Sequence, residues 1–437
     1  MKRKSHICRF GGAGLVALFL FILQGVCFAG MAVSPLQQTV DVKPGKKATF
    51  SITISNNIRS PKARPCPIKI DVLDFQVSDT GQLLFGPEYK HPRSAAAWIK
   101  MEPNEIVLRP GESKEMKATV TAPLDADGDY WAAAMIELGE PQKGEKGVQV
   151  KLRTASGIFV HVARRNYTER GNVTDVNVTL PEFDTNEVSI EKNTPVSVIY
   201  KLKEKQSLKI DAKLKNNGLI AILARGKAHV YSEDWRKIAT IPLYVSRRQV
   251  LPGDSRWFTG IMTEPLPAGN YKLRIFFDSG EKFKRKMTKD AEFTVSTDLA
   301  EVWAKNFTND GTSKLNLEPQ KFELKLNPGR LTAEVIQITN QGLNTVAANC
   351  RIEGNGISND WIELKTTDFT LAPHSQNSIS YKIKVPSDAE PGTYNWTIFI
   401  ETEHSGLESQ GQNIEQYKIP VFLVIDKNAR VITDKEE

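Results

Sequence analysis

A pattern of proline, glycine and tyrosine recurs three times in this chain and restricts the folds that it can adopt. Each copy has a proline, a second proline 13 residues later (110 to 123, 252 to 265, 373 to 386) and then a Gly-x-Tyr. The three tyrosines are Tyr130, Tyr271 and Tyr394. Because Pro and Gly mark turns between strands, the pattern predicts a strand between two corners, a turn and a further strand, used three times.

Copies one and three also match upstream of this pattern. Residues 42–57 (VKPGKKATFSITISNN) align without gaps with residues 326–341 (LNPGRLTAEVIQITNQ), and Trp98 aligns with Trp361. Repeats of this length have the size of independent domains and are too long for the units of a solenoid. The sequence therefore predicts an all-β fold of three consecutive immunoglobulin-like antiparallel β-sandwich domains after a signal peptide.

The expected domain limits follow the repeats. They are 1–29 for the signal peptide, 30–165 for the first sandwich (module one), 171–296 for the second (module two), 313–426 for the third (module three) and 427–437 for a charged tail. Residues 297–312 are expected to form a linker with at most a short helical turn, because no helix-period segment of useful length appears. Each Gly-x-Tyr is expected to place its ring in the core and to send its hydroxyl to an upstream carbonyl.

The first 29 residues have the features of an export signal. Basic residues precede an apolar stretch at 15–23 that is too short to span a bilayer comfortably, and small residues end at Ala29. Cleavage after Ala29 would leave no membrane span in the mature chain. We therefore expect a periplasmic or secreted protein.

Charge and cysteine content exclude further classes. The net charge is +7, and the leader holds four basic residues and no acidic one, so the mature charge is +3 with both signs interspersed. Nucleic-acid binding requires a concentrated basic face, and none is visible. Cys66 and Cys350 fall in different modules. Either they are separate thiols or modules one and three touch, and neither case is a disulfide framework within a domain.

The sequence contains few patterns that are typical of catalytic or metal-binding sites. Its histidines are scattered, and no Cys-x-x-Cys, Gly-x-Ser-x-Gly or phosphate-binding glycine loop occurs. Asp125, Asp127 and Asp129 resemble the start of a calcium loop, but the glycine stands at position four and not six, which favours a turn. We expect no catalytic residue, no metal, no cofactor and no enzymatic activity. An enzyme with convergent carboxylates stays open as a third possibility.

The feature with functional content is a long alternating segment at 148–162. Such a strand at the end of a module can expose backbone groups to which another chain adds a strand, with its apolar side chains gripping the guest. The candidate partner-binding residues are Val148, Val150, Leu152, Ile158, Val160 and Val162. The alternative is an ordinary interior strand whose apolar face lies on its own core.

Module one resembles the N-terminal domain of the periplasmic pilus (fimbrial) chaperones. The resemblance is carried by SPLQQTVDVKPGKKATFSITISN (34–56), WIKMEPNEIVLRPGESKEMKATVTAP (98–123), Gly-Asp-Tyr (128–130) and VQVKLRTASGIFVHV (148–162). It implies that the last strand complements unfolded pilin subunits. The family also anchors a subunit carboxylate with an Arg and a Lys, and the positions that correspond approximately are Gln38 and Gly157.

The preferred hypothesis is an exported, non-enzymatic, chaperone-like or assembly factor of the periplasm. It would bind an extended polypeptide, such as a surface or pilus subunit, by β-strand addition. The alternative is a cell-surface adhesion protein that binds a glycan or the cell wall through loop ends and exposed aromatic residues.

Overall fold

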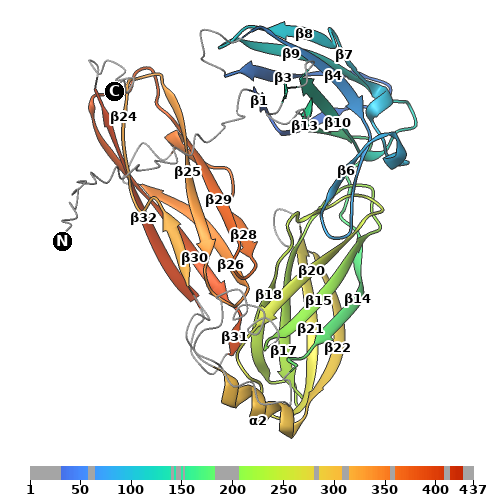
Figure 1. Cartoon of the computed structure of the whole chain (residues 1–437), viewed down its shortest axis with the longest axis vertical. Helices are drawn as coiled ribbons and strands as arrows, with labels where there is room; N and C mark the ends of the chain where they lie inside the picture. Colours follow the sequence, from blue (N-terminus) through green and yellow to red (C-terminus); the bar gives the residue numbers. More distant parts are fainter. Residues whose placement is uncertain are drawn as a thin grey trace, which may run out of the picture.

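The computed structural model describes residues 31–57, 64–138, 142–143, 149–150, 153–182, 206–279, 285–307, 314–354, 360–407 and 414–426. Regular structure in these residues is almost entirely β-strand (Figure 1). Most strand pairs are antiparallel and form layered sheets. The all-β, immunoglobulin-type fold predicted from the sequence is confirmed.

Module one packs a four-stranded sheet on a five-stranded sheet. The first, in the order β1-β3-β9-β7, contains β1 (Met31–Ser34), β3 (Lys47–Asn56), β9 (Ser113–Thr121) and β7 (Ile99–Met101). The second, in the order β2-β13-β10-β4-β8, contains β2 (Gln37–Val42), β13 (Arg153–Val162), β10 (Gly128–Leu138), β4 (Cys66–Leu73) and β8 (Glu105–Leu108). Smaller elements are β5 (Phe75–Val77) with β6 (Leu83–Phe85), β11 (Gln142–Lys143) with β12 (Gln149–Val150), and the 3-10 turns Pro87–Tyr89 and Ala96–Trp98.

Module three repeats this connectivity strand for strand. Its first sheet, β23-β25-β29-β27, contains β23 (Leu315–Glu318), β25 (Leu331–Asn340), β29 (Gln376–Lys384) and β27 (Ile362–Leu364). Its second, β24-β32-β30-β26-β28, contains β24 (Phe322–Leu326), β32 (Ile414–Ile425), β30 (Gly392–His404), β26 (Val346–Gly354) and β28 (Asp368–Leu371). In both modules the first strand leaves one sheet at a proline, Pro35 or Pro319, and continues in the other sheet, parallel to the last strand.

Module two has a different strand arrangement, and one of its sheets includes a strand from the module-three segment. One sheet is β14-β15-β20, with β14 (Gly171–Thr179), β15 (Leu208–Asn216) and β20 (Ser255–Met262). The other is β22-β21-β17-β18-β31, with β22 (Arg285–Val295), β21 (Gly269–Ser279), β17 (Arg225–Ser232), β18 (Lys237–Leu243) and β31 (Gly406–Leu407). A short ladder joins β16 (Ile222–Leu223) to β19 (Gln249–Val250). Since β31 belongs to the module-three segment, the two modules share one sheet.

The Pro-Gly corners form the turns that the sequence predicts. Their glycines have positive φ, and in each turn the N–H of the following residue reaches the carbonyl three residues earlier. A side chain is disfavoured at positive φ, which explains the glycine in these turns. The glycines are Gly45 (φ 68°), Gly111 (φ 77°), Gly253 (φ 87°) and Gly329 (φ 77°).

The tyrosine corners agree with the sequence prediction in two copies of three. The hydroxyls of Tyr271 and Tyr394 donate to carbonyls four residues upstream, at 2.7 and 2.9 Å. Tyr130 departs from it, because its hydroxyl accepts the Asp127 N–H at 3.3 Å. Its ring packs on Trp98, with 4.3 Å between centroids.

Three large apolar clusters form most of the interior of the described residues, and a smaller fourth cluster lies between modules one and two. Each large cluster is built mainly from one of the three expected modules, with fully buried residues such as Ile54 in the first, Phe258 in the second and Ile398 in the third. The period of two explains this packing, because it places alternate side chains of each strand on one face. The domain limits themselves remain a prediction.

The segment after module two is the main departure from the sequence prediction. It contains α2 (Thr297–Asn306), a ten-residue helix and not a single turn. The Ser296 hydroxyl caps it by accepting the Leu299 N–H at 3.2 Å. Trp303 is only 1% exposed and donates to the Thr263 carbonyl at 2.9 Å, so the helix is docked on module two. This helix is too short for its apolar side chains to show a clear helical period in the sequence.

We expect Trp303→Ala to lower the free energy of unfolding by about 3–5 kcal/mol, because it empties a large buried site and orphans the Thr263 carbonyl. Urea unfolding followed by circular dichroism measures this loss. The matched control is Val302→Ala on the exposed side of the same helix (38% exposed), for which we expect a change within about 0.5 kcal/mol. Equal effects of the two substitutions would contradict the docking of α2.

Candidate partner-binding site

The strand β13 is covered along only part of one side. On one side β10 pairs with it from Arg153 to Val162. On the other side β2 pairs with it only from Gly157 to Val162. Among the described residues, 153–156 therefore have a neighbouring strand on one side and an open edge on the other.

The direction of the backbone shows which groups this edge offers. The Gly157 N–H donates to the Leu36 carbonyl at 2.9 Å, and the Ala163 N–H donates to the Val42 carbonyl at 3.1 Å. Odd-numbered residues of β13 thus point their backbone groups toward β2. By the same alternation, the N–H and C=O groups of Arg153 and Ala155 point to the open side. Two consecutive pairing positions are available to a guest strand.

The side chains predicted from the sequence to grip a partner do not lie on this edge. Ile158, Val160 and Val162 have no exposed surface and belong to the module-one core, so their assignment as partner contacts is corrected. The physical reason is the period of two, which turns all same-parity side chains of β13 into its own sandwich.

The other three predicted contacts are not placed by the structure. Val148 and Leu152 lie outside the described residues. Val150 is in β12, and only its backbone is described. Their contact with a partner stays a prediction.

Other side chains stand beside the open edge. Leu36, at the point where the chain passes from β1 to β2, is 62% exposed. Phe159 and Ala155 are on the outward face of β13 and pack at the rim of a small apolar cluster with Phe75. Sequence reasoning missed Leu36 because only the proline before it signals that the strand changes sheets there.

The two positions that the sequence resemblance singled out for a carboxylate anchor, Gln38 and Gly157, carry no charge. Gln38 faces Ile158 in the ladder, and its side-chain amide donates to the Ser51 carbonyl at 3.4 Å. Gly157 has no side chain, and a Cβ built there would meet only the Phe159 ring at 3.4 Å, with the nearest backbone atom at 3.9 Å.

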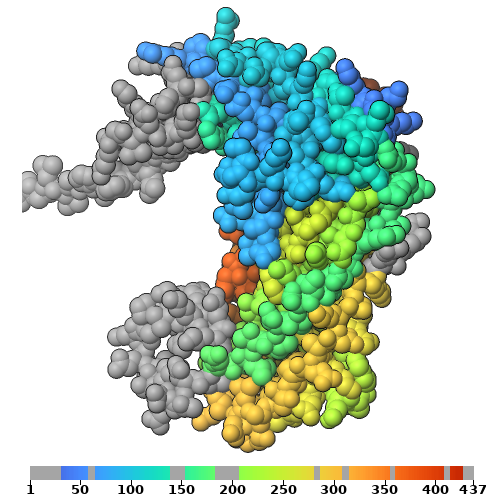
Figure 2. Space-filling model, turned by 90° about the vertical axis from the view of Figure 1, so that its right-hand side faces the viewer, coloured from blue at the N-terminus to red at the C-terminus, as the bar shows by residue number. Residues whose placement is uncertain are grey.

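A hairpin of module one fixes it to module two. The turn between β5 and β6 brings the Asp79 carbonyl to the Trp257 N–H at 2.8 Å and the Ser78 carbonyl to the buried Arg256 guanidinium. Figure 2 shows this blue segment against the green and yellow surface of module two. On the same joint, Asp129 accepts the Ala221 N–H at 2.6 Å.

This joint contains a carboxyl group that is largely buried. Burial raises the pKa of Asp254 to about 6 against the opposing attraction of Arg256, and its Oδ2 has no hydrogen-bond partner in the described part of the chain. The ring of His91, from module one, is 3.9 Å away. Burial, assisted by Arg93, lowers the pKa of His91, so this imidazole is a weak counter-charge at neutral pH.

Modules two and three are joined by buried polar contacts. Asp368 of β28 accepts from Arg225 at 2.5 Å and also from Arg248. The Asn344 side chain accepts the Thr263 N–H at 3.0 Å and donates to the Glu264 carboxylate at 2.9 and 3.0 Å. Because the Asp368, Asn344 and Glu264 side chains are buried and hydrogen-bonded across the joint, they define one relative position of the two modules.

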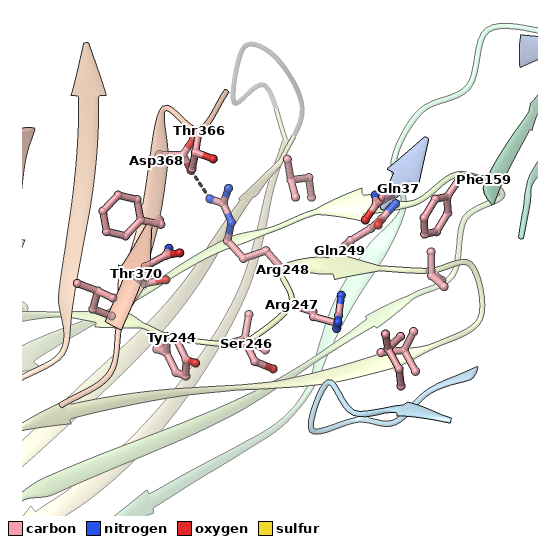
Figure 3. Close-up of a pocket in the computed structure, with 18 of the residues that line it drawn as sticks. Gln37, Phe159, Tyr244, Ser246, Arg247, Arg248, Gln249, Thr366, Asp368 and Thr370 are labelled. Carbon is pink, nitrogen blue, oxygen red and sulfur yellow. Dashed lines mark hydrogen bonds and ion pairs between the residues drawn. The ribbon is translucent and has the colours of Figure 1, made fainter. Parts of the chain in front are cut away.

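A half-open cavity of about 560 Å³ lies at the junction of the three modules (Figure 3). The cavity has a polar and an apolar lining from all three modules. Module one contributes Gln37, Phe75, Val77, Leu83 and Phe159, module two Leu223, Tyr244 to Gln249 and Leu251, and module three Thr366, Asp368 to Leu371, Gln376 and Asn377. In Figure 3 the Arg248 guanidinium points to Asp368, whereas Arg247 points away from it. Among the described residues, Arg247 forms no ion pair.

Other classes of site were sought in the same residues. The described part of the chain contains no group of three or more His, Cys, Asp or Glu that could hold a metal ion. None of its helices has the length and apolar character needed to cross a membrane.

The chain matches no protein-family model and no curated protein. Solved structures similar to it include the class 5 fimbriae chaperone CfaA (12% identity, TM-score 0.33, covering 60% of this chain and 98% of that one). Others are the E. coli chaperone DraB (12%, 0.28, 61% and 96%) and the CsuC–CsuE chaperone–tip adhesion subunit complex of Acinetobacter baumannii (11%, 0.27, 52% and 89%). Pilus chaperones are thus among the solved structures that this chain resembles, as predicted.

We expect stability to depend on pH through Asp254. A carboxyl whose pKa rises from 3.8 to about 6 on folding binds its proton more tightly in the folded state. Stability is therefore lost as pH rises from about 4 to 6 and is constant above that range, with a total loss of about 3 kcal/mol. Thermal or urea unfolding of the wild type and Asp254→Asn across this range measures the difference. A constant difference between the two proteins at all pH values would contradict the assignment.

Proposed function

We propose that this chain is an exported, non-enzymatic, chaperone-like assembly factor of the periplasm. It binds an extended polypeptide, such as a pilus or surface subunit, by strand addition to β13. The observation that carries the proposal is that, in the described part of the chain, residues 153–156 of β13 have an open edge on the side where β2 covers the strand only from Gly157 onward. Natural proteins normally protect such edges, and an unprotected one is a place for another chain.

The surroundings of the edge support the same proposal. Leu36 offers an exposed apolar surface next to the pairing positions, and Phe159 continues it toward the junction. A guest strand would pair with Arg153 and Ala155 and pack its side chains against these groups. Backbone pairing supplies affinity without requiring one guest sequence, which suits a chaperone-like role.

Module three shows what a less suitable edge looks like. Its strand β32 is also partly uncovered, because β24 pairs with it only from Val421. The glycine that begins the neighbouring strand pairs with Val162 in module one and with Ile425 in module three. Gly157 and Pro420 each lie five residues before that paired residue, so Pro420 occupies the position of Gly157. Proline lacks the N–H that Gly157 uses, and proline on an edge strand is a common protection against pairing. The comparison favours module one as the acceptor.

The test is Ala155→Pro in the mature chain. Proline removes an N–H that points to the open side and leaves the β10 ladder intact, so we expect peptide binding to fall at least about tenfold with little change in unfolding temperature. The probe is a synthetic set of unstructured peptides with alternating apolar residues, and binding is measured by fluorescence anisotropy.

Ala155→Ser keeps the N–H and serves as the matched control. Hydrogen exchange of wild-type protein should show new protection at Arg153 and Ala155 when a peptide is bound. Undiminished binding by a folded Ala155→Pro variant, or protection elsewhere only, would overturn strand addition at this edge.

One surface favours the alternative function of glycan or cell-wall binding. Trp235 is 43% exposed and has a left-handed φ of 64°, a costly conformation for a bulky residue. Its ring lies near Tyr231 (5.4 Å) and near the Lys272 and Arg274 cations (4.8 and 4.6 Å). An exposed indole can pack against the C–H face of a sugar ring.

If this surface binds glycans, Trp235→Ala should abolish binding of soluble peptidoglycan fragments in calorimetric titrations. Val335→Ala, which removes an exposed apolar side chain in module three, should leave it unchanged. Absence of fragment binding by the wild type would exclude the alternative.

A further inference from the structure

We propose that a second copy of this chain pairs with an open edge of module three, strand β25 against strand β25 about a two-fold axis. The inference is independent of the proposed function, because it concerns another edge on another module. On one side of β25, β29 pairs with it from Leu331 to Thr339. On the other side β23 reaches only Gln337 to Asn340, so in the described part of the chain residues 331–336 have no neighbouring strand there.

The direction of the backbone shows which groups this edge offers. The Val385 N–H donates to the Arg330 carbonyl at 2.9 Å, so even-numbered residues of β25 turn their backbone groups to the β29 side. By the alternation of an antiparallel strand, odd-numbered residues turn theirs to the open side. The N–H and C=O groups available to a second copy are those of Leu331, Ala333 and Val335.

The side chains of these three residues form an exposed apolar row. Leu331 is 61% exposed and Val335 is 45% exposed, and Ala333 between them is also exposed. All three lie on the outward face of their sheet, because the inward face of β25 carries Ile336 and Ile338 of the module-three core. The open edge therefore combines unpaired backbone groups with apolar side chains.

Module one has the same edge with a different surface. There β1 pairs with β3 only from Thr53 onward, so the earlier part of β3 is uncovered in the same way. The gapless repeat of 42–57 and 326–341 places polar residues at the three corresponding positions, which are Lys47, Thr49 and Ser51. Charged and polar side chains commonly protect an edge strand from pairing. Their replacement by an apolar row in module three indicates a partner strand.

The edge of module three is complementary to itself. A two-fold axis at Ala333 places Leu331 of each copy opposite Val335 of the other and uses all three open backbone positions. On the inward face, Thr332 then lies opposite Glu334 of the second copy. The Thr332 hydroxyl already donates to the Glu334 carboxylate at 2.9 Å within one chain, so the two side chains are chemically compatible. Self-complementary pairing of one patch about a two-fold axis is the commonest arrangement of homodimers.

The limits of the open segment select this register. It is bounded by the turn in which the Arg330 N–H donates to the Asn327 carbonyl, and by Gln337, where β23 begins to pair. Moving the axis two residues either way would bring the second strand against that turn or against β23.

The edge is also directed away from the joint with module two. The chain passes from β23 into β24, and β24 and β28 are the opposite edges of the second sheet of module three. Since module two holds β28, a strand beside β23 lies on the other side of the sandwich.

Sedimentation velocity of the mature chain tests the pairing. The concentration series runs up to about 100 μM, because an interface of this small size gives a weak dimer. Ala333→Pro removes an N–H on the open side and leaves the β29 ladder intact, so we expect self-association to weaken at least about tenfold. The matched control is Thr49→Pro at the corresponding position of module one, which should leave self-association unchanged.

An exchange of charge tests the register. Leu331→Lys and Val335→Glu should each weaken self-association about fivefold, because each change places a charge opposite an apolar side chain twice in the dimer. The double variant should return to within about threefold of the wild type and lose this recovery at high salt, because each new Lys faces a new Glu of the second copy. Within one chain the two positions are about 13 Å apart, so an internal ion pair does not explain recovery. Both positions are exposed, and circular dichroism verifies that the variants fold.

The outcomes are distinct from those of the strand-addition test. If the wild type stays monomeric throughout the series, the dimer is excluded and strand addition to β13 is unaffected. If Ala155→Pro abolishes self-association and Ala333→Pro does not, the copies pair through β13 and the inference is wrong. Losses in the single variants that the double variant does not recover would overturn the two-fold register.

Discussion

Burial of alternate side chains is the constraint on which the whole molecule depends. Each sheet has one face in a core, so each strand keeps only its opposite face and its backbone edges for other contacts. In β13 the core takes Ile158, Val160 and Val162. What remains is an outward face with Phe159 and the backbone of Arg153 and Ala155. The strand can therefore serve the core and a guest at once, because the two use different groups.

Much of the fold was predictable because its signals are local. Pro-Gly turns and alternating strands are encoded by neighbouring residues, and the turns at Gly45, Gly111 and Gly253 follow directly. The long segment at 148–162 was identified for the same reason. Its partner strand was not, since the parallel pairing of β2 with β13 joins residues 120 positions apart, such as Gln37 and Gly157.

The contacts between modules could not be predicted from local sequence patterns. The two-residue strand β31 completes a sheet of module two, and Trp303 completes its core from a segment expected to be a linker. Neither has a repeated or periodic signature. The same holds for the candidate site: Leu36 lies in a turn, and it becomes notable only when the fold brings it to β13.

The repetition of one connectivity in modules one and three shows how context changes the use of a fold. In module one the outward face of β10 and β13 is covered at Trp131 and Phe159 by the β5–β6 hairpin and by Leu251 of module two. That cover directs the remaining open edge toward the junction. In module three the corresponding last strand carries Pro420, and its opposite edge strand, β28, is held by arginines of module two. The same architecture thus leaves an open edge in the described part of module one and a docked edge strand in module three, because different surfaces of it are turned to module two.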